Sequence, residues 1–179
     1  STSIRPPIRN ILWHQFSLPK VCRQNKYDVM FLTAANRRTP WSLPCPMVGT
    51  VHDFSSLHVA GKYDRSRDLY IRRVLPILIR RLDHVLTVSE SSKRDIVEYA
   101  GIPADRVTVT PLAADHDIYF PGDKAEARRT IRDRYKIEPP YILYTSRLEH
   151  PGKNHVRLIE AFSILKARAK IPHRLVLAG

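Results

Sequence analysis

Short β-rich runs alternate with helical stripes along this chain, and that alternation constrains the fold more than any other feature of the sequence. Strands that alternate with helices form parallel sheets covered by helices on both faces, and ligands bind beyond the carboxyl ends of such strands. We therefore predict an α/β protein with Rossmann-like parallel sheets. The β-rich runs lie at residues 27–33, 47–51, 84–88, 106–110, 142–145 and 174–177.

Three helices are predicted from periodicity and end signals. In residues 66–82 the apolar side chains fall on one side of a helix with arginines opposite, and Pro76 is expected on the outward side, where it would kink the helix. Ser92 and Asp95 predict a capping box at the start of the next helix, which ends at Gly101. Residues 154–168 predict a helix between two β-rich runs, which makes a βαβ unit.

Composition bounds the class of protein. With 43% hydrophobic and 26% charged residues the chain is expected to bury a core, and no apolar run approaches the roughly 20 residues that span a bilayer. Cys22 and Cys45 lack metal-type spacing, which favours a reducing compartment, so we expect a cytoplasmic protein. The net charge of +13 favours polyanionic partners, namely nucleic acid, anionic lipid headgroups or the phosphates of a small ligand.

A composition shift marks a predicted domain boundary. Residues 121–140 are rich in charge and bracketed by prolines, as is typical of a connection between two domains. We place the boundary near Gly122, which predicts one domain over residues 1–122 and the start of a second over residues 123–179.

Residues 146–154 form a loop after one predicted strand and before a predicted helix. Arg147 and Lys153 lie on either side of a Pro-Gly turn, so both can face one anion, to which the helix N-terminus adds N–H groups. A diphosphate fits this arrangement, and Glu149 would repel it unless the carboxylate pairs with Arg147 or faces solvent. The alternative is that both cations are ordinary solvated charges, because the chain has neither a P-loop nor a dinucleotide fingerprint.

Histidines give a second candidate site and no metal site. His52 directly follows the run at 47–51, so it is either a site residue at the carboxyl end of a strand or a satisfied loop residue. His116 lies between two aspartates, but three adjacent side chains do not converge like metal ligands. His150 and His155 are five residues apart, a spacing that does not align them on one helix face.

Several segments resemble one family in consistent order. The run VSESSKRDIVEYAGIPADRVTVTPLAADHDIYFPG, followed by YILYTSRLEHPGKNHVRLIEAFSILK and RLVLAG, resembles the retaining GT-B glycosyltransferases of family four. The resemblance extends from YDVMF at Tyr27 through TVHD at Thr50 to Gly179. It implies the GT-B architecture of two Rossmann-like domains, the first on the acceptor side and the second binding the nucleotide-sugar donor.

The resemblance also implies a reaction and its residues. It implies transfer of a hexose of mannose or glucose type from a UDP- or GDP-sugar to a lipid-linked or saccharide acceptor, with retention and without a metal or other cofactor. Arg147 and Lys153 align with the residues that bind the donor diphosphate, and His52 aligns with a catalytic histidine near the donor sugar. Fixed cations stabilise the leaving diphosphate more in the transition state than in the ground state.

Two family segments are not found in the sequence. The glycine-rich loop expected well before Tyr27 and the E-x7-E segment expected after Gly179 are both missing. We therefore expect an internal fragment in which both domains are incomplete, and we expect the isolated chain to be inactive because two half-domains cannot enclose a donor.

Another function remains open on the same fold. The arginines in residues 72–81 suggest a non-catalytic basic module that binds membranes or nucleotides, or an enzyme held peripherally on the inner face of the membrane. Nucleic acid is not expected, because an RNA-binding aromatic signature is missing and the basic residues are spread over several elements.

Overall fold

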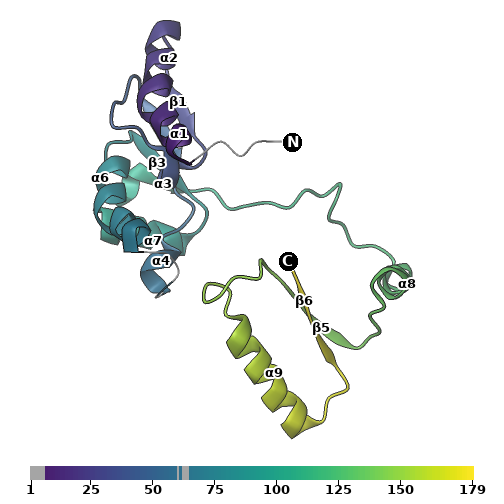
Figure 1. The fold of residues 1–179 in the computed structure, drawn as a ribbon. Coiled ribbons are helices and arrows are strands. Elements are labelled where there is room, and N and C mark those ends of the chain that lie inside the picture. Colours follow the sequence, from purple (N-terminus) through teal and green to yellow (C-terminus); the bar gives the residue numbers. More distant parts are fainter. Residues whose placement is uncertain (1–6, 60, 62–64) are drawn as a thin grey trace. The chain divides into compact units, whose positions relative to one another are not determined.

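The computed structural model describes residues 7–59, 61 and 65–179, which form two compact units (Figure 1). The described part of the first unit comprises residues 7–58 and 65–112, and that of the second comprises residues 59, 61 and 113–179. The break after Leu112 lies ten residues before the boundary predicted near Gly122, and it falls outside the charged stretch at residues 121–140. The assignment of the two units to acceptor and donor stays a prediction.

The first unit is built on a four-stranded parallel sheet. Its strand order is β1-β2-β3-β4, so neighbours in the sheet are also neighbours in sequence. Gly49 in β2 pairs with Val85 in β3, which in turn pairs with Val107 in β4. The strands are β1 Met30–Leu32, β2 Met47–Thr50, β3 His84–Thr87 and β4 Val107–Val109. The prediction of parallel strands joined by helices is confirmed.

Helices connect these strands, and helices, strands and loops all contribute side chains to the core. The buried cluster joins α2, the sheet and α6 to α7, and its largest fully buried side chains include Phe54, Met47 and Ile79. The helices of this unit are α1 Pro7–Leu12, η1 Trp13–Ser17, α2 Leu18–Asn25, α3 Ala35–Arg38, α4 Ser55–His58, α5 Arg65–Leu69, η2 Tyr70–Val74, α6 Leu75–Ile79, α7 Glu90–Ala100 and η3 Ala104–Arg106.

The predicted amphipathic helix at residues 66–82 exists with a changed geometry. It runs as α5, the π-helical turn η2 and α6, and Arg73 and Arg80 are exposed as expected. Pro76, however, is buried and does not face outward. The π-helical turn comes directly before Pro76, and Leu75 donates its N–H to the Tyr70 carbonyl, five residues back. A wider turn of this kind accommodates a proline that has no N–H to give.

The capping box predicted at Ser92 and Asp95 is wrong. The N-cap of helix α7 is Ser89, three residues before Ser92. The Ser89 Oγ accepts a hydrogen bond from the Ser92 N–H at 3.2 Å. Asp95 instead pairs with His58 on α4, at 3.0 Å. Gly101 ends the helix in the left-handed conformation, as predicted.

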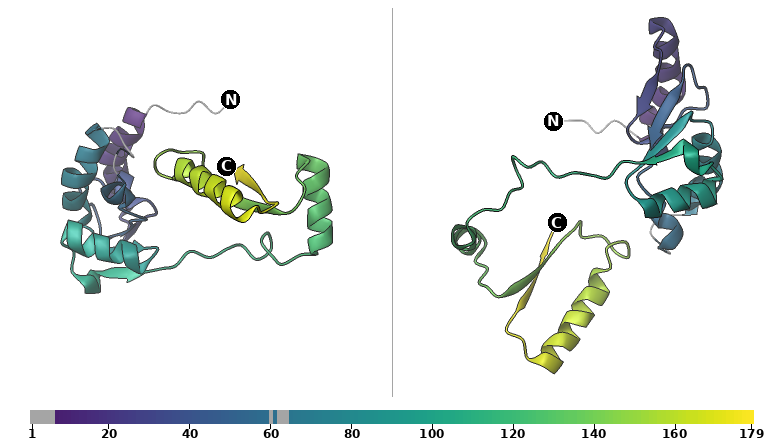
Figure 2. Two further views of the ribbon diagram at one scale, coloured as in Figure 1. Left: turned by 90° about the horizontal axis from the view of Figure 1, so that it is seen from below. Right: turned by 180° about the vertical axis from the view of Figure 1, so that it is seen from behind.

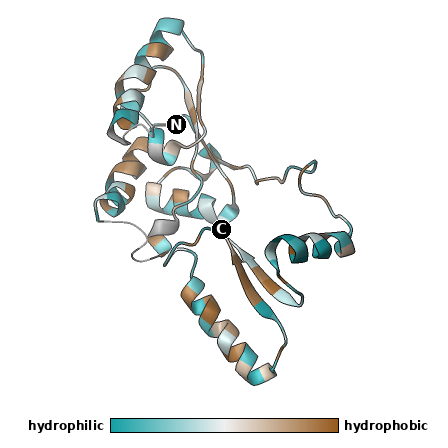
Figure 3. Ribbon diagram, turned by 45° about the vertical axis from the view of Figure 1, so that its right-hand side comes forward, coloured by the Kyte–Doolittle hydropathy of each residue, from teal (hydrophilic) through white to brown (hydrophobic). Residues whose placement is uncertain are grey.

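The second unit contains the predicted βαβ unit and one unpredicted helix. Strand β5 Tyr141–Thr145 pairs in parallel with β6 Arg174–Ala178, and helix α9 His155–Ala169 runs alongside them (Figure 2). Helix α8 Lys124–Tyr135 lies in the charged stretch that the sequence analysis assigned to a connection, and Asp123 caps it by accepting from the Glu126 N–H at 2.7 Å. Figure 3 shows α8 as largely hydrophilic, whereas β5 and β6 are largely hydrophobic.

The two units differ sharply in burial. Within residues 113–179, His155 alone is buried, whereas the first unit encloses a continuous apolar core. None of the helices in the described part of the chain has the length and apolar content to cross a membrane.

Candidate functional site

His52 follows the carboxyl end of β2, where hydrogen bonds to β3 fix the main chain of the preceding residue. Val51 donates its N–H to the Leu86 carbonyl at 2.9 Å and accepts from the Thr87 hydroxyl at 2.8 Å. Val51 and Thr87 are both buried. Because these bonds continue the β2–β3 pairing past the end of the strand, His52 begins its loop from a rigid position.

The His52 residue is held on both its ring and its main chain. The ring lies 3.1 Å, measured from Nε2, from the Thr33 carbonyl oxygen, so Nε2 is the protonated nitrogen in this contact. In the neutral ring the lone pair is then on Nδ1, which can accept a hydrogen bond. The His52 carbonyl accepts from the Ser92 hydroxyl at 3.1 Å, which ties it to the start of α7. His52 therefore lies where the loops after β1, β2 and β3 meet.

Arg147 and Lys153 lie in the second unit on one loop, residues 146–154, which we name the β5–α9 loop. Its start is anchored by the Ser146 N–H, which donates to the Ala178 carbonyl of β6 at 2.8 Å. Inside the loop, Glu149 donates its N–H to the Arg147 carbonyl at 2.8 Å, and Lys153 donates to the Glu149 carbonyl at 3.0 Å. These bonds fold the loop back on itself, so that Arg147 and Lys153 lie on one compact segment of chain.

The charges of the β5–α9 loop are accessible. The Arg147 side chain is 79% exposed and its Nη2 lies 3.0 Å from Oε2 of Glu149, whose side chain is 30% exposed. Lys153 is exposed as well. Glu149 therefore pairs with Arg147, one of the two orientations foreseen for it, and an arriving anion would compete with this carboxylate for the guanidinium.

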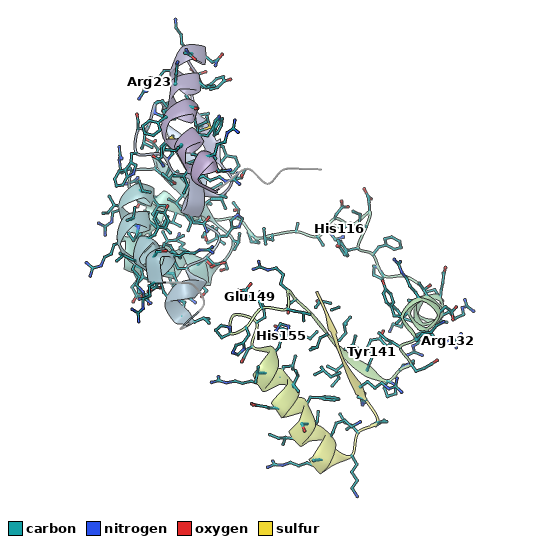
Figure 4. The ribbon with its side chains drawn as sticks, in the orientation of Figure 1. Arg23, His116, Arg132, Tyr141, Glu149 and His155 are labelled. Atoms are coloured by element: carbon teal, nitrogen blue, oxygen red, sulfur yellow. The ribbon has the colours of Figure 1, made fainter. Side chains whose placement is uncertain are left out.

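Three further side chains hold this loop in place. His155 is 9% exposed, and its Nε2 lies 3.1 Å from the Ser146 hydroxyl across the loop (Figure 4). The Tyr144 ring packs edge-on against the His155 ring, with centroids 5.3 Å apart. The Tyr144 hydroxyl donates to the Lys153 carbonyl at 3.0 Å. Sequence reasoning missed this cluster, because a strand tyrosine and a helix-start histidine carry no pattern that pairs them.

The N-terminus of α9 faces the same loop. Asn154 precedes the helix in a left-handed conformation, with φ of 54°, and makes no side-chain cap hydrogen bond to it. The first turn of α9 contains no acidic residue. The first N–H groups of a 15-residue helix, together with its dipole, therefore favour an anion at this end.

Metal binding is not indicated in the residues described. Across 7–59, 61 and 65–179, no three His, Cys, Asp or Glu side chains gather as a possible metal-ion site. His155, considered above with His150, has the Ser146 hydroxyl as its partner.

Two units with parallel sheets and polar loops after their strands define an α/β protein of the Rossmann-like class. Residues 1–118, more than half of the chain, match the family model described as Glycosyltransferase Family 4, and the chain belongs to this family. The matched residues include His52 and end before Arg147 and Lys153.

Relatives named as mannosyltransferases share part of their length with the chain. It is 30% identical over 132 residues to O-antigen chain mannosyltransferase B of Escherichia coli, which covers 74% of the chain and 34% of the relative. It is 28% identical over 142 residues to the serotype-specific mannosyltransferase WbdA of Escherichia coli. This match covers 78% of the chain and 17% of the relative. The chain thus spans about a third or less of the length of these relatives.

A solved structure and one more distant relative complete the comparison. The chain is 27% identical over 139 residues to D-inositol 3-phosphate glycosyltransferase of Acidothermus cellulolyticus, covering 75% of the chain and 30% of the relative. A crystal structure of a glycosyltransferase from Rickettsia africae matches 100% of the chain and 53% of its own length, with 17% identity and a TM-score of 0.49.

Proposed function

We propose that the protein carrying this chain transfers a hexose from a nucleoside-diphosphate sugar to a saccharide or lipid-linked acceptor, with retention. Membership of Glycosyltransferase Family 4 supports glycosyl transfer. Mannose is the first choice of sugar over glucose, because two of the relatives are named mannosyltransferases. The donor is a UDP- or GDP-sugar, and the reaction uses no metal or other cofactor.

The observation that carries this proposal is that two exposed cations, Arg147 and Lys153, lie on the loop that leads into the N-terminus of α9. Arg147, Lys153 and the N-terminus of α9 offer three sources of affinity for one diphosphate, and both side chains are exposed. As the glycosidic bond breaks, negative charge grows on the leaving diphosphate. Cations that are already in position stabilise that charge more in the transition state than in the ground state.

In this proposal His52 positions the reacting sugar. Its main chain and its Nε2 are both held, so the ring presents Nδ1 in a fixed direction. A fixed acceptor of this kind can bind a hydroxyl of the donor sugar or of the acceptor and so orient it for reaction. This role needs no proton transfer by the ring.

The test measures sugar transfer from UDP- and GDP-hexoses, GDP-mannose first, by the protein that carries this chain and by its Arg147→Ala and Lys153→Ala variants. Loss of one charge-stabilising donor should lower kcat/KM by roughly a hundredfold or more. Arg168→Ala is the matched control, because Arg168 is exposed near the opposite end of α9. Unchanged kcat/KM in the Arg147→Ala/Lys153→Ala double variant would show that the loop does not bind the diphosphate.

A second candidate function is peripheral association with an anionic membrane at its cytoplasmic face. The outward side of α5, η2 and α6 carries a row of exposed residues at intervals of four, in which cationic and large aliphatic side chains alternate: Arg65, Leu69, Arg73 and Ile77. Leu69 is 60% exposed and Ile77 is 49% exposed. Arginines beside exposed aliphatic side chains suit a surface of anionic headgroups over an apolar interior.

Sedimentation with vesicles tests this association. We expect the chain to sediment with phosphatidylglycerol-containing vesicles, not with pure phosphatidylcholine, and to be released as salt rises. An Arg73→Glu/Ile77→Glu variant should lose binding, whereas Arg128→Glu on the exposed helix α8 should bind nearly as well. Equal sedimentation with neutral and anionic vesicles would contradict the proposal. Equal loss of vesicle binding in the Arg73→Glu/Ile77→Glu and Arg128→Glu variants would contradict it as well.

A further inference from the structure

A hollow of about 350 Å³ opens on the first unit, and its lining includes neither His52 nor any residue that contacts it. One wall comes from η1 and α2, and the other comes from the segment between α3 and β2. Its lining residues are Gln15, Phe16, Pro19, Arg23, Trp41 and Ser42.

Hydrogen bonds across the hollow fix both walls. Gln15 donates its side-chain amide to the Thr39 carbonyl at 3.3 Å, and its Oε1 accepts from the Trp41 N–H at 2.9 Å. Thr39 itself is buried and donates its hydroxyl to the Ala35 carbonyl at 2.7 Å. Arg23 of α2 (Figure 4) donates to the Ser42 hydroxyl. The segment that carries Trp41 is thus fastened to the helix at both ends of the hollow.

The side chains left open in this hollow are of the kind that binds saccharides. Phe16 is 70% exposed and Trp41 is 52% exposed, so two aromatic residues present apolar surface to water. Aromatic faces of this kind pack well against the C–H face of a sugar ring. A guanidinium has five N–H donors, and Arg23 uses one of them on Ser42, which leaves donors for sugar hydroxyls. A few polar groups beside aromatic walls are typical of small-ligand sites.

The hollow is connected to His52 through one short stretch of chain. Thr33, whose carbonyl contacts the His52 ring, lies directly after β1. Helix α3 follows it, and Thr39 and Trp41 come next. The chain that begins at Thr33, beside the His52 ring, therefore leads through α3 to the wall of the hollow that contains Trp41.

We propose that this hollow is a subsite for the acceptor saccharide, in which Phe16 and Trp41 contact the sugar rings and Arg23 binds hydroxyls. The inference rests on the proposed function for the identity of its ligand, and it names the class of acceptor as a saccharide rather than the lipid portion of a lipid-linked chain. Occupation of the hollow places the acceptor on the unit that contains His52.

The two tryptophans of the chain allow a direct test. Trp13→Phe leaves Trp41 as the sole tryptophan, and Trp41→Phe leaves Trp13, which does not line the hollow. We titrate both variants with mannotriose, with maltotriose as the glucose counterpart, and record tryptophan emission. Binding should change the emission of Trp13→Phe saturably and leave that of Trp41→Phe unchanged. Adding Phe16→Ala to Trp13→Phe should weaken binding by roughly threefold to tenfold, the range of one aromatic contact.

Activity assays separate this inference from the proposed function. If the protein transfers sugar, Trp41→Ala should raise KM for a saccharide acceptor and leave KM for the donor unchanged. Transfer with an unchanged acceptor KM would overturn the subsite while the proposed function stands. Saturable emission changes without transfer from any nucleoside-diphosphate hexose would show that the hollow binds saccharide, but would overturn the proposed function and with it the assignment of that saccharide as an acceptor. Emission that does not respond to either trisaccharide overturns the subsite.

Discussion

At the scale of single residues, Glu149 controls how available Arg147 is to an anion. The two side chains are paired at 3.0 Å, so a diphosphate must displace a carboxylate to reach the guanidinium. Glu149→Gln removes that charge and keeps the size of the side chain. We expect several-fold tighter binding of UDP or GDP, measured by calorimetry with the protein that carries this chain. Glu138→Gln, an exposed site before β5, is the control, and equal effects in both variants would contradict a specific role for Glu149.

Cys45 provides a prediction that depends on pH. Burial raises the pKa of the Cys45 thiol, and Cys22 raises it further through its charge and its hydrogen bond to Cys45. Since the thiolate is the reactive form, alkylation of Cys45 by iodoacetamide should need a higher pH than the roughly 8.5 midpoint of a free cysteine. Peptide mass spectrometry over a pH series measures this midpoint. Cys22→Ala should lower it, and a midpoint at or below that of a free cysteine in the unaltered chain would contradict the prediction.

At the scale of elements, Gly49 sets how closely β2 approaches its neighbours. A Cβ at this position would lie 2.6 Å from the Ala35 Cβ of α3 and 2.7 Å from a Leu82 methyl carbon. Gly49→Ala should therefore lower the free energy of unfolding by about 1–3 kcal/mol, the usual cost of overpacking a core. Urea unfolding measures the change. The matched control is Gly122→Ala, where a Cβ meets nothing within 4 Å, and a similar loss there would refute the steric explanation.

The helix ends show which local signals the sequence carries. Gly101 was predicted to end α7 because glycine adopts a left-handed conformation without strain, and it does so here with φ of 62°. The start of α7 was misplaced, because Ser89, Ser91 and Ser92 are each capable of capping and only the tertiary position of the chain selects Ser89. Helix α8 was missed although Asp123 and Glu126 carry the D-x-x-E signal of a capped start.

At the scale of the whole molecule, the two units should differ in stability. The first unit has a continuous apolar core, whereas His155 is the one buried residue in 113–179. Apolar burial supplies most of the free energy of folding, so little of it is available to the second unit in this chain. Hydrogen exchange on the 179-residue chain should show amides of β5 and β6 exchanging far faster than those of β2 and β3. Equal protection in both sheets would contradict this expectation.

The sequence by itself determined the class of fold and the positions of its strands. Runs rich in Val, Leu and Ile located six parallel strands to within a few residues, since apolar runs between turn signals report burial directly. The spacing of Arg147 and Lys153 around a Pro-Gly turn indicated one loop with two cations, and the structure places both on the β5–α9 loop.

Tertiary structure alone decided the partners of these residues. It selected the pairing of Glu149 with Arg147 over the solvent-facing alternative, set His155 against Ser146, and brought Trp41 to Gln15 across 26 residues of chain. Pro76 is buried, although helical periodicity placed it outward, because a π-helical turn rotates the residues that follow it. Periodicity describes one element at a time, whereas a hydrogen bond between loops depends on where the sheet holds their ends. The class of fold could therefore be predicted from the sequence, whereas most contacts of the candidate site residues could not.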